Sequence, residues 1–367
     1  EAAKLRFEGQ ATLANSVSEV VEQSDYVFMS LPNSDVVSAV VGEMLLCDVK
    51  GKIIVDPESL TEEQKLKWDS DWGTNTWSNA NVTLKEVEGP VDADITFTNT
   101  ELANVLYNVL GSDKVTLKAD GTAVMKQSDV EDVTELYFGW DDYDITTLNG
   151  IENFKYLEVL DCNKTGLNEC DLSKNTALKR VSLMENNLVN LDFNQNVNLE
   201  ELSIRGNLNL ESLKIDKCSN LRVLDLNDVG EKILTVEIAD VTKIEVLGYG
   251  YTNLSFDLNE FTSLKELSCY GHNFNALNLS AERKMNLEKL ECYYCGIDAL
   301  DLSEFPNLTF LSCYRNNIDY LDLTKVPSLE MLNCHGNQLE TLDITTLENT
   351  LEYLYCGNQK TNDGEYK

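Results

Sequence analysis

The cysteines are the residues of this chain whose type and spacing most directly suggest chemistry. Cys292 and Cys295 form a C-x-x-C in the segment KLECYYCG, which is the spacing of a thiol redox pair or of half a zinc site. Ten cysteines in 367 residues are also compatible with a disulfide framework. The two histidines, His272 and His335, leave almost no material for a hydrolytic triad or a histidine metal site.

The spacing of the cysteines indicates a repeat rather than a reactive cluster. Cys269, Cys292, Cys313, Cys334 and Cys356 follow one another at intervals of 23, 21, 21 and 22 residues. A fixed period of this length is the signature of a repeat architecture. The unit is L-x-x-L-x-C-x-x-N-x-L-x-x-L-D-L-S, followed by a few variable residues. Units begin at Leu157, Leu178, Leu199, Leu221, Ile244, Leu264, Leu287, Leu308, Leu329 and Leu351, and a degenerate unit begins at Val133.

The first half of each unit predicts a short strand. Alternation of period two places positions four and six on one face and positions three, five and seven on the other. The second half, L-x-x-L-D-L, alternates likewise and predicts a second extended segment. A unit offers about six apolar side chains at roughly 1.5–3 kcal/mol each, against roughly 1.5 kcal/mol of ordering entropy per residue. No unit folds alone, so the units must stack into a solenoid with a parallel sheet on its concave side.

The repeat resembles the bacterial leucine-rich repeats, specifically the 21-residue cysteine-ladder type of internalin-like surface proteins. The copies LEKLECYYCGIDALDLSEFPN and LTFLSCYRNNIDYLDLTKVPS carry the resemblance most clearly, and it covers residues 133–360. It implies a right-handed leucine-rich repeat solenoid. It further implies a non-catalytic role in adhesion or host interaction, with an extracellular or cell-surface location.

Within this repeat the C-x-x-C has a structural explanation. Cys292 occupies position six, with Cys269 and Cys313 on the neighbouring units, and Cys295 occupies position nine, where Asn316 and Asn337 stand in later units. Parallel strands lie ~4.8 Å apart with side chains pointing the same way, so ladder sulfurs do not converge as a disulfide requires. We therefore expect free, packed thiols and a weaker rung at Cys295, with redox or zinc roles as the alternatives.

The segments before the repeats divide into three parts. Residues 94–132 predict an N-terminal cap, with a strand in DITF, a helix cap at Thr100 and an amphipathic helix that buries Leu102, Val105, Leu106, Val109 and Leu110. Such a cap would cover the open end of the first repeat. Residues 67–93 predict a linker, and residues 361–367 form a tail.

Residues 1–66 predict a small α/β segment with strands at residues 26–31 and 52–56. This segment resembles part of the nucleotide-binding domain of the β-hydroxyacid dehydrogenases, whose strand ends in Leu-Pro as Leu31 and Pro32 do here. It lacks the G-x-G-x-x-G that receives the pyrophosphate and the helical domain with the catalytic lysine. We therefore expect an incomplete, inactive Rossmann-like fragment, and a nucleotide-binding remnant remains an alternative function.

The composition limits which kinds of partner the chain is expected to bind. Asp and Glu number 63 against 29 Lys and Arg, for a formal charge of −34, so the average surface repels nucleic acid and anionic lipid. No run approaches the ~18 apolar residues of a membrane span. We expect no cofactor, no metal and no enzymatic activity.

The strand positions that face outward offer the best candidate binding surface. Position seven of four consecutive units carries Tyr270, Tyr293, Tyr314 and His335, and positions three and five add Phe310, Met331, Tyr353 and Tyr355. Solvent-facing aromatic side chains provide a large contact area at little entropic cost, which predicts a protein- or glycan-binding concave face in the C-terminal half. The alternatives are an aromatic column that only stabilises the sheet by stacking on itself, and a purely structural spacer.

Overall fold

The computed structural model describes residues 26–28, 53–55, 92–139, 143–233, 235–272 and 279–360. The chain divides into two compact units, Glu1–Ala93 and Asp94–Lys367. In the first unit, β1 (Tyr26–Phe28) and β2 (Ile53–Val55) pair in parallel, within the two expected strands. The remainder of the expected nucleotide-binding fragment, nearly all of the linker and the tail lie outside the described residues. None of the described helices is long and apolar enough to cross a membrane.

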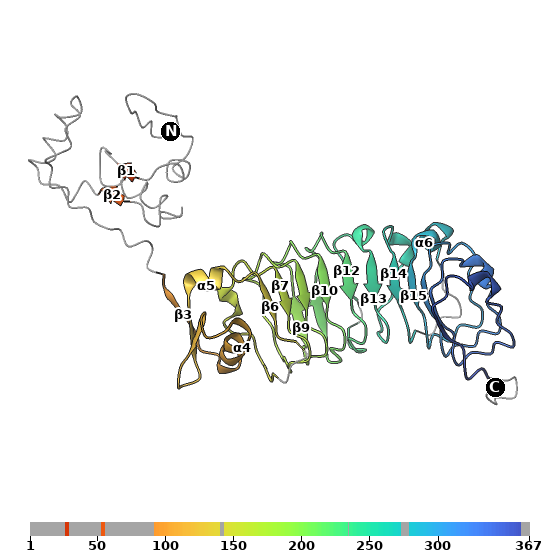
Figure 1. Cartoon of the computed structure of the whole chain (residues 1–367), viewed down its shortest axis with the longest axis horizontal. Coiled ribbons are helices and arrows are strands. Elements are labelled where there is room, and N and C mark those ends of the chain that lie inside the picture. The colour runs from red at the N-terminus through yellow and green to blue at the C-terminus, as the bar shows by residue number, and fades with distance from the viewer. Residues whose placement is uncertain are drawn as a thin grey trace, which may run out of the picture. The chain divides into compact units, whose positions relative to one another are not determined.

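The second unit is a leucine-rich repeat solenoid, as the sequence predicts (Figure 1). Its described residues form one parallel sheet of eleven strands, one from each predicted unit, and each strand covers positions three to five. The strands are β6 (Glu135–Tyr137), β7 (Val159–Asp161), β8 (Arg180–Ser182), β10 (Glu201–Ser203), β12 (Val223–Asp225), β13 (Val246–Gly248), β14 (Glu266–Ser268), β15 (Lys289–Glu291), β16 (Phe310–Ser312), β17 (Met331–Asn333) and β18 (Tyr353–Tyr355).

The core lies behind this sheet. Position-four side chains align across the strands, as Leu290, Leu311 and Leu332 do on β15 to β17, and all three are fully buried. The ladder sulfurs of Cys162, Cys269, Cys292, Cys313 and Cys334 are buried with them, which confirms the cysteine ladder. Cys356 is exposed, because β18 is the last strand of the sheet.

In four repeats an asparagine at position nine, namely Asn186, Asn207, Asn316 or Asn337, closes the turn after the strand. The Asn316 side-chain amide donates to the carbonyls of Cys292 and Cys313, both at 2.9 Å, and its oxygen accepts from the backbone of Cys295 at 2.9 Å and Ile297 at 3.2 Å. The Cys295 thiol takes the equivalent place, but its single proton can go to only one of two carbonyls, that of Cys269 at 3.3 Å or that of Tyr293 at 3.4 Å. This geometry agrees with the expected weaker rung.

The second half of the repeat is extended in only part of the array. Strands β9 (Asn190–Asp192) and β11 (Ser212–Lys214) pair in parallel, as predicted. Elsewhere among the described residues this half forms no strand, so the prediction is wrong there. In several repeats a short helical turn lies at or after the end of this half: η2 (Ile151–Asn153), η3 (Val241–Lys243), η4 (Leu258–Glu260), α6 (Ala281–Asn286), η5 (Leu323–Lys325) and η6 (Thr345–Leu347). An aspartate at the N-cap explains three of them, namely Asp240, Asp257 and Asp322. Asp322, for example, caps η5 by accepting from the Thr324 backbone at 3.1 Å.

The N-terminal end of the solenoid is covered by an antiparallel sheet and a helix, which Figure 1 shows next to β6. The sheet contains β3 (Asp94–Phe97), β5 (Ala123–Lys126) and β4 (Val115–Leu117), and β5 leads into α5 (Gln127–Glu131). Phe97 stacks on Phe154 of the first turns at 5.5 Å between ring centroids.

Helix α4 (Thr100–Leu110) is capped by Asn99 rather than by Thr100. The Asn99 side-chain oxygen accepts from the backbone of Glu101 and Leu102, because an amide one residue before the helix reaches both free N–H groups. Leu102, Val105 and Leu106 are buried as predicted, whereas Val109 is exposed, since it turns away from the sheet.

Candidate ligand-binding surface

Three strands at the C-terminal end of the sheet carry an apolar row on their outward face. The row consists of Phe310, Met331 and Tyr353, which lie in register on β16, β17 and β18. Tyr353 is 57% exposed and the other two are half-buried. The Lys289 ammonium lies 4.9 Å from the centre of the Phe310 ring, on the inner end of the row. The predicted position-three residues therefore form one continuous surface.

The position-seven tyrosines form a stack rather than a set of free rings. The ring centroids of Tyr270, Tyr293 and Tyr314 follow one another at 4.3 Å, with planes 8° and 14° apart. These three side chains therefore stack on one another, which is the alternative to ligand recognition. The expectation that Tyr270 faces solvent is wrong, because only 2% of it is exposed.

The burial of Tyr270 has a specific cause on the preceding repeat. A Cβ atom at Gly250 would lie 2.6 Å from the Tyr270 ring, so only a glycine there lets the ring settle against the sheet. Tyr251 packs edge-on at 5.2 Å, and Tyr293 covers the other side. The phenol donates to Asp228 at 2.8 Å.

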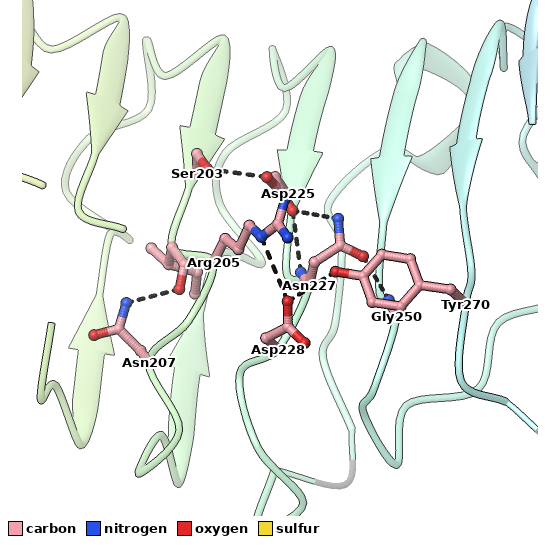
Figure 2. Close-up of polar contacts among 9 residues, drawn as sticks. Ser203, Arg205, Asn207, Asp225, Asn227, Asp228, Gly250 and Tyr270 are labelled. Atoms are coloured by element: carbon pink, nitrogen blue, oxygen red, sulfur yellow. Dashed lines mark hydrogen bonds and ion pairs between the residues drawn. The ribbon is translucent and has the colours of Figure 1, made fainter. Parts of the chain in front are cut away.

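In the middle of the same face, polar side chains bond to one another (Figure 2). Arg205 pairs with Asp228 at 3.4 Å, and this carboxylate also receives the Tyr270 hydroxyl. Asp225 accepts from both the backbone and the side chain of Asn227, the latter at 2.7 Å. Burial raises the pKa of Asp225, against the lowering effect of these hydrogen bonds. Because these groups satisfy one another, this region offers few free groups to a ligand.

A hollow of about 400 Å³ opens beyond the end of the tyrosine stack. In the part of the chain that the structure describes, its lining is Tyr294, Tyr314, Arg315, Asn333, His335 and Tyr355. We call it the C-terminal hollow. The sequence predicts Tyr314, His335 and Tyr355 as site residues and misses Tyr294, Arg315 and Asn333.

The missed residues Tyr294 and Arg315 share position eight, whose backbone is left-handed in every repeat where the structure describes it. Their φ angles are 55° and 53°, and three repeats use glycine at this position, as Gly271 and Gly336 illustrate. A left-handed conformation costs a non-glycine residue roughly 1–2 kcal/mol. The same conformation occurs at Lys164, Glu185, Gly206, Asp228, Tyr251 and Asn358. Seven of these ten repeats carry a non-glycine residue at position eight, so the sequence gives no signal that singles out Tyr294 and Arg315.

Arg315 and Tyr294 hold each other in place at the rim of the hollow. The guanidinium carbon of Arg315 lies 5.1 Å from the centre of the Tyr294 ring, and its Nη1 donates to the Tyr294 hydroxyl. The Tyr294 ring packs edge-on against Tyr314 at 5.7 Å. On the far side, His335 Nε2 lies 3.3 Å from the Asn358 amide. The arrangement presents fixed aromatic faces together with hydrogen-bond donors.

The lining of the hollow offers groups that can bind a ligand. The hollow has an imidazole, but none of its six lining residues is a carboxylate, thiol or aliphatic hydroxyl that would complete a catalytic set. The ladder thiols are buried behind the sheet, where burial raises the pKa of Cys292 and raises that of Cys334 to about 12. The described cysteines, Cys292 and Cys295 among them, are free, and no three metal-ligating side chains converge within the described ranges.

Neither a family model nor a curated protein sequence matches this chain. Solved structures do. The functional domain of InlJ from Listeria monocytogenes, which includes a cysteine ladder, is 25% identical with a TM-score of 0.51, over 62% of this chain and 49% of its own. An internalin (inlF) from Listeria monocytogenes is 19% identical with a TM-score of 0.44, over 72% and 91% of the two chains. YopM from Yersinia pestis is 22% identical with a TM-score of 0.46, over 60% and 61%.

The fold and the first of these similarities define the class. The second unit is a leucine-rich repeat solenoid of the cysteine-ladder type, similar to the InlJ domain. The matched region spans about half the length of the InlJ structure.

Proposed function

We propose that this chain is a non-catalytic binding module that holds a protein or glycan ligand against the C-terminal end of its concave face. The observation that carries the proposal is the apolar row and the C-terminal hollow side by side on β16, β17 and β18. The setting we propose is the bacterial cell surface or the extracellular space, with a role in adhesion or host interaction. Similarity to the InlJ domain supports this setting.

The distribution of free groups supports a ligand at this end of the sheet. Tyr353 and Tyr355 are 57% and 55% exposed, and both are rigid side chains that combine an apolar ring with a polar tip. The central part of the face, by contrast, is occupied by the buried Tyr270 and its Asp228 contact. A ligand would therefore meet unsatisfied aromatic surface mainly beyond the tyrosine stack.

The net charge of −34 disfavours nucleic acid and anionic membranes as partners. A nucleotide-binding function would rest on residues 1–66, which lie almost entirely outside the described residues. Titration with NAD, followed by a thermal shift, separates that alternative from ours, because our proposal predicts no change.

A matched pair of tyrosines tests the proposed surface. Tyr355 occupies position five of the last strand and is 55% exposed. Tyr137 occupies position five of the first strand and is 50% exposed. The purified chain is screened on glycan and protein arrays, and each hit is titrated against Tyr355→Ala and Tyr137→Ala. We expect the first change to weaken binding by about tenfold or more and the second to leave it unchanged. If the two variants bind every hit with equal affinity, the result would favour the interpretation of the chain as a structural spacer.

A further inference from the structure

The C-terminal hollow begins where the tyrosine stack ends. Tyr293 covers one face of the Tyr314 ring at 4.3 Å, so the side of Tyr314 toward the next repeat borders the hollow. That repeat carries His335 instead of a fourth tyrosine, and among the described residues no ring contact joins His335 to Tyr314. A flat ligand ring of the right size would continue the stack. The C–H face of a sugar ring is suited to this, because its positively polarised hydrogens meet the negative face of an aromatic ring.

The lining favours a hydroxylated ring over an apolar one. Each of the six side chains carries a hydrogen-bonding group: three phenols, a guanidinium, an amide and an imidazole. No aliphatic side chain is among them. A pocket for a leucine or phenylalanine of a protein ligand would be lined mainly by apolar side chains. The lining instead matches a ring that carries several hydroxyl groups.

The charge of the hollow is opposite to that of the chain. Acidic residues outnumber basic ones by 63 to 29, yet the lining holds Arg315 and His335 and no carboxylate. Glu291, which lies near Tyr314 on the preceding strand, is paired with Lys289 at 3.4 Å. The Tyr294 ring orients the Arg315 guanidinium, whose planar fork matches a carboxylate.

From these observations we propose that the C-terminal hollow binds an acidic sugar, with the sugar ring on Tyr314 and its carboxylate on Arg315. The proposal rests on the proposed function and names the class of ligand that this end of the concave face takes. Asn333, His335 and Tyr355 are placed to contact the hydroxyl groups.

A matched pair of sugars tests the proposal. D-Glucuronate and D-glucose differ only in a carboxylate in place of a hydroxymethyl group, and both are titrated into the purified full chain by ligand-observed saturation-transfer NMR. We expect glucuronate to bind with a dissociation constant of about 1 mM and glucose about tenfold more weakly. Arg315→Gln should remove the tenfold preference. Arg180→Gln is the matched control, because it makes the same charge change on β8 of the same sheet, where Arg180 pairs with Glu201.

Three results would overturn the acidic-sugar assignment. They are equal binding of the two sugars, binding of neither sugar, and equal binding of N-acetylglutamate, which has carboxylates but no ring. Each of these leaves the wider proposal intact if array hits still depend on Tyr355 and not on Tyr137. Conversely, Arg315→Gln could abolish the glucuronate preference while no array hit depends on Tyr355. That result would support sugar binding in the C-terminal hollow and refute the wider binding surface.

Discussion

Replacing Asn316 by cysteine is the sharpest test of how the repeats hold together. The chain makes the same replacement itself at Cys295, one repeat earlier. Asn316 forms four hydrogen bonds, two to the carbonyls of Cys292 and Cys313 and two from the backbone of Cys295 and Ile297. A thiol can replace one donated bond, as Cys295 does, but it is a poor acceptor.

The expected loss follows from the groups left behind. Asn316→Cys leaves two buried backbone N–H groups, those of Cys295 and Ile297, without an acceptor. Each unsatisfied group costs about 1–3 kcal/mol. We therefore expect the free energy of unfolding to fall by about 2–6 kcal/mol. The reverse change, Cys295→Asn, restores the amide and should raise the free energy of unfolding by about 1 kcal/mol.

Urea titration followed by far-ultraviolet circular dichroism measures both changes. Asn317→Cys is the control, because Asn317 is the exposed neighbour and its side chain bonds, among the described residues, a single partner, Asp298, at 3.1 Å. Its substitution should change the free energy of unfolding by less than about 0.5 kcal/mol. If Asn316→Cys is as mild as Asn317→Cys, the asparagine ladder does not stabilise the turns and our reasoning fails.

Three further predictions follow from buried groups. Tyr270→Phe removes the hydroxyl bonded to Asp228 and should lower the free energy of unfolding by about 1.5 kcal/mol, measured by urea titration. A thiol reagent at pH 8 should label the exposed Cys356 in the native chain and spare Cys292, whose pKa burial raises, as peptide mapping by mass spectrometry will show. Burial raises the folded-state pKa of Asp225, so its contribution to stability is fullest below the unfolded pKa and is lost as pH rises through the folded pKa. The melting temperature of Asp225→Asn should therefore rise relative to that of the native chain as the pH increases from 4 to 7.

Each of these expectations has an outcome that contradicts it. An unchanged unfolding free energy for Tyr270→Phe would mean that water replaces the hydroxyl at Asp228. Labelling of Cys292 as fast as that of Cys356 would show that the ladder opens in the native state. A melting-temperature difference for Asp225→Asn that stays constant with pH would mean that this carboxyl titrates normally.

The sequence predicts the scaffold of the second unit well. The intervals between Cys269 and Cys356 locate every strand from β14 to β18, and the same unit places the earlier strands. It predicts the second half of the repeat less well, since the aspartate after L-x-x-L caps a helical turn at Asp322 and belongs to strand β9 at Asp192.

The candidate site shows the same division. By itself the sequence determined the repeat count, the inward cysteines and the outward aromatic positions, because a fixed period and a two-residue alternation are local properties of the chain. Only the tertiary structure decided that Tyr270 is buried, because that depends on the space left by Gly250 on the previous repeat. It also decided that Tyr294 and Arg315 join Tyr314 around one hollow, because a left-handed residue escapes the alternation from which side-chain direction is read.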